Sequence, residues 1–275
     1  MSDVPVVRIG AGSVSPLHTV REIWQYRDLF QALGTRDLRL RYRQTFLGIA
    51  WVVLQPLAAA GIFAFVFGTI ARVPTDGQPY LLFALAALAG WNFFSSVLTR
   101  ASTSLIQNPQ LVTRVYFPRL ILPLAVVPAA LVDLLVTVVA FAGIALAQGH
   151  GFDARLVGLP VAILLLGALA LGAGFAAAAL AVRYRDVQYL LPVAIQLALY
   201  ASPVAYSSSA VPDRWQVLYY ANPLAAPLEL MRWSLLGTPA PAVRELLYSV
   251  SSAALLVLIG TAIFRGIERS FADEI

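Results

Sequence analysis

Six long apolar runs constrain this chain more than any other feature of its sequence. They cover residues 48–71, 80–99, 121–147, 158–182, 189–206 and 246–264. A transmembrane helix needs roughly 20 mainly apolar residues to cross about 30 Å of hydrocarbon, and each run is at or near that length. Only 12% of the residues are charged, whereas about 25% are charged in an ordinary soluble domain. The sequence therefore predicts an all-α integral membrane protein with six transmembrane helices.

The basic residues predict how these spans are oriented. Six crossings place both termini on one side of the membrane, and 14 of the 19 basic residues fall on that side. Basic residues accumulate in cytoplasmic loops, so this side is predicted to be the cytoplasm. The first 47 residues contain seven arginines and lack the apolar core and cleavage site of a signal peptide, so we expect the N-terminus to stay cytoplasmic.

The region before the first span has two patterns. Within residues 19–33, Ile23, Tyr26, Phe30 and Leu33 form one helical stripe, which predicts an amphipathic helix in the cytoplasmic membrane interface. A helix that packs on a partner protein has the same pattern. Residues 36–43, RDLRLRYR, alternate like a strand, but we interpret them as a basic lead-in to the first span because no second strand candidate lies nearby. We divide the chain into a cytoplasmic N-terminal region (1–47), a six-span transmembrane domain (48–264) and a cytoplasmic tail (265–275).

Residues 207–244, on the outer side, fit neither a span nor a simple loop. Pro212 suits a first helical turn, Asn222-Pro223 ends one helix and starts another, and Gly237 suits a C-terminal cap. The second helix, of about 14 residues, is too short to cross the bilayer, so a re-entrant or interfacial hairpin is predicted. Glu229 and Arg232 stand three residues apart and can pair.

Several chemistries are excluded or weakly supported. There is no cysteine, which excludes disulfides and thiolate metal sites, and all 19 basic residues are arginine, which excludes a Walker A lysine. His18 and His150 fall on opposite sides, so we expect no metal site. Asp133 is the single carboxylate well inside an ordinary span, and it is either a functional residue or a structural hydrogen-bonding group between helices.

A set of local signatures carries a family resemblance. In chain order they are RDLRLRYRQTFLGIAWVVLQP (36–56), AGWNFF (89–94), NPQLVTRVYFPRLILP (108–123), RYRDV (183–187), NPLAAPLELMRWSLLG (222–237) and FRGIERSFADEI (264–275). Together they make the chain resemble the permease subunits of ABC exporters that move lipid-linked polysaccharides such as O-antigen, capsule and teichoic acid.

The resemblance implies a homodimer in the bacterial inner membrane that works with two copies of a separate ATPase subunit. ATP and Mg would then bind the partner ATPase, and this chain would hold no cofactor and perform no catalysis. The substrate would be a lipid-linked glycan, and no nucleic-acid partner is expected. Two alternatives stay open: export of a small hydrophobic drug or lipid, and an integral-membrane transferase, for which the sequence offers no catalytic acid or histidine cluster on one face.

The resemblance also suggests which loops contact the ATPase. The first cytoplasmic loop, between residues 100 and 123, combines an interrupting Asn-Pro with exposed aromatics between arginines, a composition that suits a desolvated contact. The arginines alone are equally explained by the positive-inside rule. The coupling candidates are Asn108, Arg114, Tyr116, Phe117, Pro118 and Arg119, with Arg185 and Asp186 in the shorter second loop.

A path for a sugar chain needs flat apolar surfaces, because aromatic rings stack on sugars without demanding exact hydrogen-bond geometry. Aromatic residues also collect in belts at membrane interfaces, which is the alternative reading for each of them. The candidates for the path are Trp51, Trp91, Phe93, Phe94, Tyr200 and Tyr206.

Overall fold

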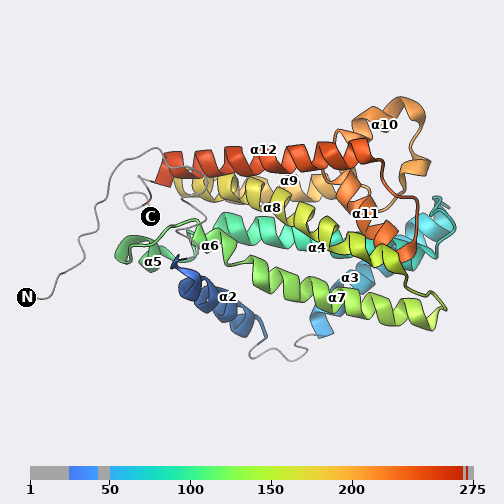
Figure 1. Ribbon diagram of the computed structural model, residues 1–275, viewed down its shortest axis with the longest axis horizontal. Coiled ribbons are helices and arrows are strands. Elements are labelled where there is room, and N and C mark those ends of the chain that lie inside the picture. The colour runs from blue at the N-terminus through green and yellow to red at the C-terminus, as the bar shows by residue number, and fades with distance from the viewer. Residues whose placement is uncertain (1–24, 43–49, 269–270, 272–275) are drawn as a thin grey trace, which may run out of the picture.

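The computed structural model describes residues 25–42, 50–268 and 271, and within these residues all regular elements are helices (Figure 1). The protein is thus an all-α, multi-pass integral membrane protein. Its elements are α2 (Arg27–Tyr42), α3 (Ala50–Phe63), the π-helix η1 (Ala64–Ile70), α4 (Tyr80–Thr103), α5 (Pro109–Arg114), α6 (Ile121–Leu124), α7 (Val127–Ala147), the 3-10 helix η2 (Ala154–Val157), α8 (Gly158–Arg183), α9 (Val187–Ala201), the 3-10 helix η3 (Ser208–Ala210), α10 (Asp213–Tyr220), α11 (Ala225–Leu236) and α12 (Val243–Glu268).

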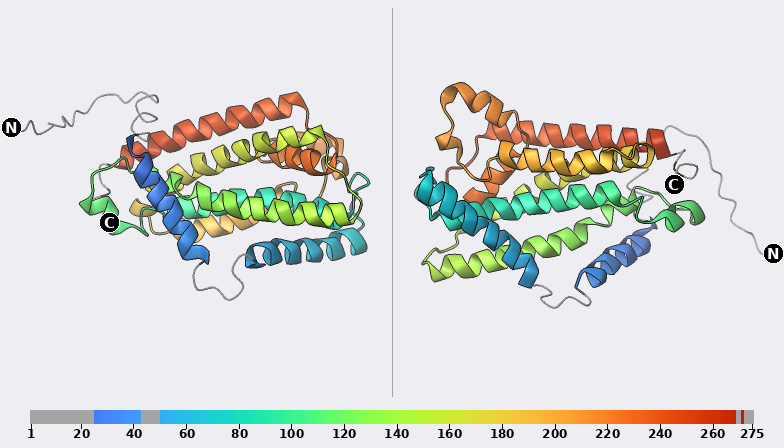
Figure 2. Two further views of the ribbon diagram at one scale, coloured as in Figure 1. Left: turned by 60° about the horizontal axis from the view of Figure 1, so that its bottom comes forward. Right: turned by 180° about the vertical axis from the view of Figure 1, so that it is seen from behind.

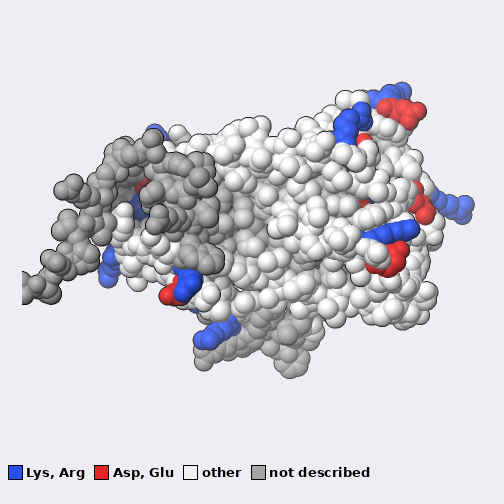
Figure 3. All heavy atoms as spheres, viewed as in Figure 1, with Lys and Arg blue, Asp and Glu red and all other residues white. Residues whose placement is uncertain are grey.

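Five helical segments are long and apolar enough to cross a bilayer: Ala50–Ile70, Tyr80–Thr103, Ile121–Ala147, Ala154–Arg183 and Val243–Glu268. Each corresponds to a run predicted from the sequence. The remaining run forms α9, which has only 15 residues, because the chain turns to an extended conformation at Ser202. Tyr206 therefore lies beyond the helix rather than within a span, and the count of six crossings stays a prediction. Charged side chains on the face shown in Figure 3 gather at the two ends of the long axis, with an uncharged zone between them.

Helix α4 is the centre of the bundle. Residues 82–91 are all buried, and α3, α7, α8 and α11 pack around them. The sides of α3 and α9 are in contrast largely exposed. Seen from behind, α3, α4 and α9 form one face of the bundle, with α4 between the other two (Figure 2).

Helices α8 and α12 pack closely along their length. An alanine Cβ at Gly260 would lie 2.0 Å from the carbonyl oxygen of Gly172, so only glycine permits the two backbones to approach this closely. Small residues at helix contacts are the usual means of packing helices within a membrane, where lipid and side chain are equally apolar.

Beside the apolar core around α4, a second apolar cluster lies at the end of the bundle where α5 and α6 are found (Figure 1). It joins Leu33 of α2, Val112 of α5, Phe117, and Phe264 and Phe271 at the C-terminal end. Helix α2 thus packs its apolar side on its own bundle, where Gly34 lies against Pro128 of α7. Its helical conformation continues through Arg36 to Tyr42, so the basic segment that we separated from the N-terminal helix is its continuation. Residues 19–24, including Ile23, and the domain boundary at residue 47 lie outside the described residues.

Candidate functional site

The loop between α4 and α6 is built into the end of the bundle on two sides. Arg36 of α2 donates to the Asn108 side-chain oxygen at 3.0 Å, and the Asn108 amide donates to the Ser104 carbonyl at 2.8 Å. Pro109 at the first turn then starts the short helix α5. The predicted Asn-Pro interruption therefore has a local role, because it starts α5 and connects the loop to α2.

The two aromatic residues of this loop have opposite environments. Tyr116 is 71% exposed, whereas Phe117 is 4% exposed and belongs to the second apolar cluster. The expectation that both rings are exposed is therefore wrong for Phe117, because this ring packs with apolar residues of α5, α6 and α12. Arg114 and Tyr116 remain on the outside, with Pro118 half-buried beside them.

Arg119 connects the loop to the C-terminal end of the chain. Its guanidinium donates to the Glu268 carbonyl and, at 3.5 Å, to the Val112 carbonyl, and it lies 5.6 Å from the centre of the Phe271 ring. Arg119, one of the predicted coupling residues, therefore binds groups of its own chain. In the second loop, Arg185 and Asp186 are both exposed, and Asp186 is the residue before α9.

The predicted hairpin consists of α10 and α11, two short helices as expected. Pro212 precedes α10 rather than entering its first turn, and Gly237 ends α11 in the left-handed conformation at φ 70°. The Asn222 side chain donates to the Ser202 hydroxyl at 2.9 Å and accepts from the Leu224 N–H at 3.0 Å, while Pro223 starts the turn into α11. Almost all of α11 is buried against α4 and α8, whereas α10 is largely exposed, so only the second of the two helices is inserted in the bundle.

Arg232 of α11 is fully buried and binds backbone carbonyls. It donates to Val204 at 2.8 Å, to Tyr206 at 3.1 Å and to Phe83 at 3.4 Å, and it lies 3.8 Å from the centre of the Phe83 ring. This one side chain therefore connects α11 to α4 and to the turn after α9.

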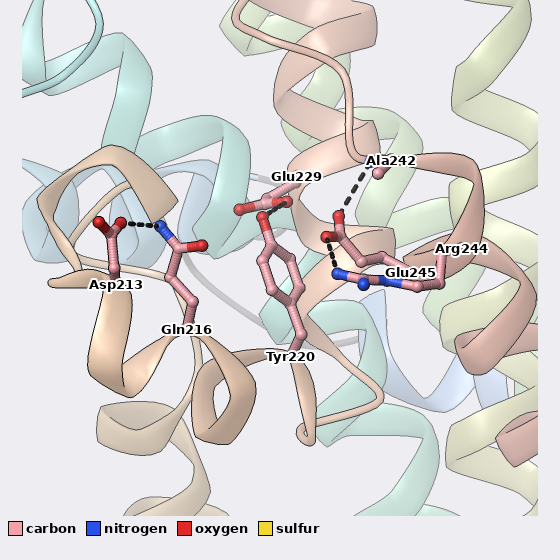
Figure 4. Close-up of polar contacts among 7 residues, drawn as sticks. All are labelled: Asp213, Gln216, Tyr220, Glu229, Ala242, Arg244 and Glu245. Atoms are coloured by element: carbon pink, nitrogen blue, oxygen red, sulfur yellow. Dashed lines mark hydrogen bonds and ion pairs between the residues drawn. The ribbon is translucent and has the colours of Figure 1, made fainter.

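The Glu229 carboxylate accepts hydrogen bonds from two tyrosines, whereas an ion pair with Arg232 was predicted. It accepts from the Tyr219 hydroxyl at 2.6 Å and from the Tyr220 hydroxyl at 3.3 Å. Burial raises the pKa of the Glu229 carboxyl, and the hydrogen bond from Tyr219 partly offsets this effect. Figure 4 shows Tyr220 pointing to Glu229, beside Glu245, which accepts from the Ala242 N–H at the start of α12.

The aromatic residues predicted to line a path fall into two groups. Trp91, Phe93 and Phe94 are buried in the core of the chain itself. Trp51 of α3 and Tyr200 of α9 are 57% and 65% exposed. Tyr206 is half-buried, with its ring 6.0 Å from that of Tyr219. Only Trp51 and Tyr200 therefore present a free ring at the surface of one chain.

A polar groove lies between α3, α4 and α7, with a volume of about 300 Å³. Asp133 of α7 lies in it and pairs with Arg100 of α4 at 3.6 Å. The sequence predicted Asp133 to be a lone acid within its span, and the pairing with Arg100 was not predicted. A signal was available, because Asn92, Ser95, Ser96, Thr99 and Arg100 recur at helical spacing along one side of the second apolar run.

Comparison with known proteins identifies the family of this chain. The family model for ABC-2 type transporters matches residues 28–236. The chain belongs to the ABC-2 type transporter family. Similar proteins include the O-antigen export system permease protein RfbA of Myxococcus xanthus, 26% identical over 94% of this chain and 100% of that protein. A protein of the same name from Klebsiella pneumoniae is 27% identical over 90% of this chain and 94% of its own. The polysialic acid transport protein KpsM of Escherichia coli is 24% identical over 86% of this chain and 92% of its own.

Membership of this family assigns the chain a role in transport rather than in catalysis, in cooperation with an ABC ATPase. The absence of lysine from the sequence agrees with that role, because a chain without lysine cannot form a Walker A phosphate-binding loop. The sites that matter are then the contact with the ATPase and the surface that the substrate passes.

Proposed function

We propose that this chain is the permease subunit of an ATP-driven exporter of lipid-linked polysaccharide. The observation that carries the proposal is the similarity to permeases named for O-antigen export and for polysialic acid transport, over nearly the whole length of each protein. No observation favours the alternatives of a small hydrophobic drug or of a transferase reaction.

The proposed assembly is a homodimer in the bacterial inner membrane with two copies of a separate ATPase, which bind ATP and Mg. Both termini lie in the cytoplasm, α9 makes the short sixth crossing, and α10 and α11 form a re-entrant hairpin from the outer side. The arginine distribution supports this orientation, since 14 of 19 basic residues fall on the cytoplasmic side. The chain is divided into a cytoplasmic N-terminal region with the interface helix (1–47), the six-span permease domain (48–264) and a cytoplasmic tail (265–275).

Within this assembly, the loop between α4 and α6 contacts the ATPase. Arg114 and Tyr116 are exposed and are residue types enriched in contact hot spots, and the exposed Val115 adds apolar surface between them. The hydrogen bonds of Asn108 to Arg36 and of Arg119 to the end of α12 link this surface to α2 and to the last long helix. A displacement of the loop by the ATPase would therefore reach several helices of the bundle.

The test is deletion and complementation of the gene in its host. We expect deletion to remove surface polysaccharide and to leave lipid-linked polymer inside the cell, and the intact gene to reverse both effects. Normal surface polysaccharide in the deletion strain would refute the proposal. Purified chain alone should be a dimer and hydrolyse no ATP, and hydrolysis by rigorously pure chain would contradict the division of labour.

A further inference from the structure

One side of α4 is polar although the helix is apolar enough to span a membrane. Asn92, Ser95, Ser96, Thr99 and Arg100 lie at spacings of three and four residues, and so share one side of the helix. Asn92 and Thr99 are exposed, and the other three are partly exposed. Polar groups that face hydrocarbon lose their hydrogen bonds to water at a cost of several kcal/mol each. This side of α4 therefore faces something other than lipid.

Two neighbouring helices complete the polar surface into a groove. Helix α3 contributes the exposed Gln55, and α7 contributes Asp133 and Thr137. The Thr137 hydroxyl donates to the Asp133 carbonyl at 2.9 Å, so its oxygen can still accept a hydrogen bond from a ligand. The groove thus presents amides, hydroxyls, a carboxylate and a guanidinium, with apolar walls from Pro56, Phe93 and Leu134 among others.

The charges in the groove select between classes of ligand. Arg100 and Asp133 are 3.6 Å apart, so the groove carries no net charge from this pair. Because the two charges offset each other, the pair favours neither an anion nor a cation, and a purely apolar ligand would leave the amides and hydroxyls unpaired. A neutral ligand with many hydroxyl groups satisfies both donors and acceptors. The volume of about 300 Å³ is at the lower end of the range for small-molecule sites, which suits a sugar unit.

The position of the groove along α4 indicates on which side of the membrane it would meet the substrate. Arg100 lies in the last turn of α4, immediately before the loop that we assign to the ATPase contact. The groove therefore occupies the half of the bundle next to the ATPase, where a substrate made in the cytoplasm arrives.

We propose that the groove between α3, α4 and α7 binds sugar units of the glycan at the cytoplasmic entrance of the export path. This proposal rests on the proposed function, and it assigns the first sugar contact to polar residues of α4 rather than to aromatic rings.

The test uses the absence of cysteine from the chain, because a single introduced cysteine is a unique label. Thr99→Cys is placed in the groove, Gln31→Cys on the exposed side of α2 serves as the accessible control, and Leu164→Cys on an exposed apolar side of α8 serves as the lipid-facing control. Inside-out membrane vesicles containing the permease and its ATPase are treated with a charged methanethiosulfonate reagent. They come from cells that make the lipid-linked glycan and from cells that lack its synthesis.

We expect Thr99→Cys to be labelled in glycan-free vesicles and to be labelled about threefold more slowly when glycan is present, as for a site occupied about two-thirds of the time. Gln31→Cys should be labelled equally in both preparations, and Leu164→Cys in neither. Equal labelling of Thr99→Cys in both preparations would show a hydrated groove without a sugar, and no labelling would show a surface covered by lipid or by the second copy. Either result overturns the proposal.

A second variant tests the hydroxyls and the amide together. Asn92→Leu, Ser96→Ala and Thr99→Val combined keep similar volume and make the helix more apolar, so insertion and assembly with the ATPase should be unchanged. We expect the glycan supply needed for half-maximal export to rise about tenfold or more, as for the loss of at least one good hydrogen bond to the ligand. An unchanged requirement overturns the proposal even if labelling is protected. Failure of the proposed function is measured separately: the deletion strain would then export polysaccharide normally without this chain.

Discussion

The buried guanidinium of Arg232 provides the most direct test of how the hairpin is held in the bundle. Arg232→Leu keeps an apolar side chain at this position but removes the donors to the carbonyls of Val204 and Tyr206. A buried carbonyl left without a donor costs about 1–3 kcal/mol, and loss of the contact with the Phe83 ring adds up to about 2 kcal/mol. We expect α11 to be destabilised by about 3 kcal/mol or more, which raises the population of the displaced hairpin roughly 140-fold.

The assay is the rate at which a buried reporter cysteine reacts with a thiol reagent in purified protein. Val204→Cys is a suitable reporter, because Val204 is fully buried and cysteine is readily accommodated in apolar surroundings. Arg244→Leu is the matched control, since Arg244 is an exposed arginine paired with Glu245 at 3.7 Å, and solvent screens such pairs. If Arg232→Leu leaves the reporter as slow to react as Arg244→Leu does, the hydrogen bonds of Arg232 do not hold the hairpin and the reasoning is wrong.

Three further predictions concern the loop, the helix packing and the path. Tyr116→Ala should weaken co-purification of the ATPase roughly 30-fold without lowering the melting temperature, whereas Phe117→Ala should cost about 3–5 kcal/mol of stability; equal behaviour of the two variants would contradict their different burial. Gly260→Ala should lower the melting temperature in detergent, because its methyl group would lie 2.0 Å from a backbone oxygen, whereas Gly143→Ala meets no atom within 4 Å and should melt like the wild type. Tyr200→Leu should reduce surface polysaccharide at unchanged expression, since the ring is exposed and its loss removes a stacking surface rather than core packing; wild-type export at saturating polymer supply would remove this ring from the path.

Most of the secondary structure followed from local signals in the sequence. The apolar runs predicted five long helices to within a few residues at most ends, because a backbone in hydrocarbon must form its hydrogen bonds within the helix. Asn222-Pro223 and Gly237 predicted the ends of α11 correctly, since capping depends on residues within one turn. The apolar run that forms α9 was predicted too long, because apolar composition continues past Ser202 while the helix does not.

The environment of each candidate residue depended on tertiary structure. Tyr116 and Phe117 are adjacent aromatic residues, yet Tyr116 is exposed and Phe117 is buried. The packing of α5, α6 and α12 decides which of the two rings is covered. Trp91 was predicted to line the path because it lies within a span, and the fold places that span at the centre of the bundle. A sequence pattern shows that a side is apolar, but it does not show which neighbour covers it.

The sequence by itself determined that this chain is a helical membrane protein with long apolar helices and two short helices between residues 207 and 244. Only the tertiary structure decided the partners of the charged groups. Asp133 pairs with Arg100 on another helix, and Arg232 binds the carbonyls of Phe83 and of the turn after α9. The physical reason is that backbone hydrogen bonds and helix caps form between residues about one turn apart, so they can be predicted from local sequence. A buried charged side chain instead binds a donor or acceptor that the packing of helices distant in sequence brings close to it.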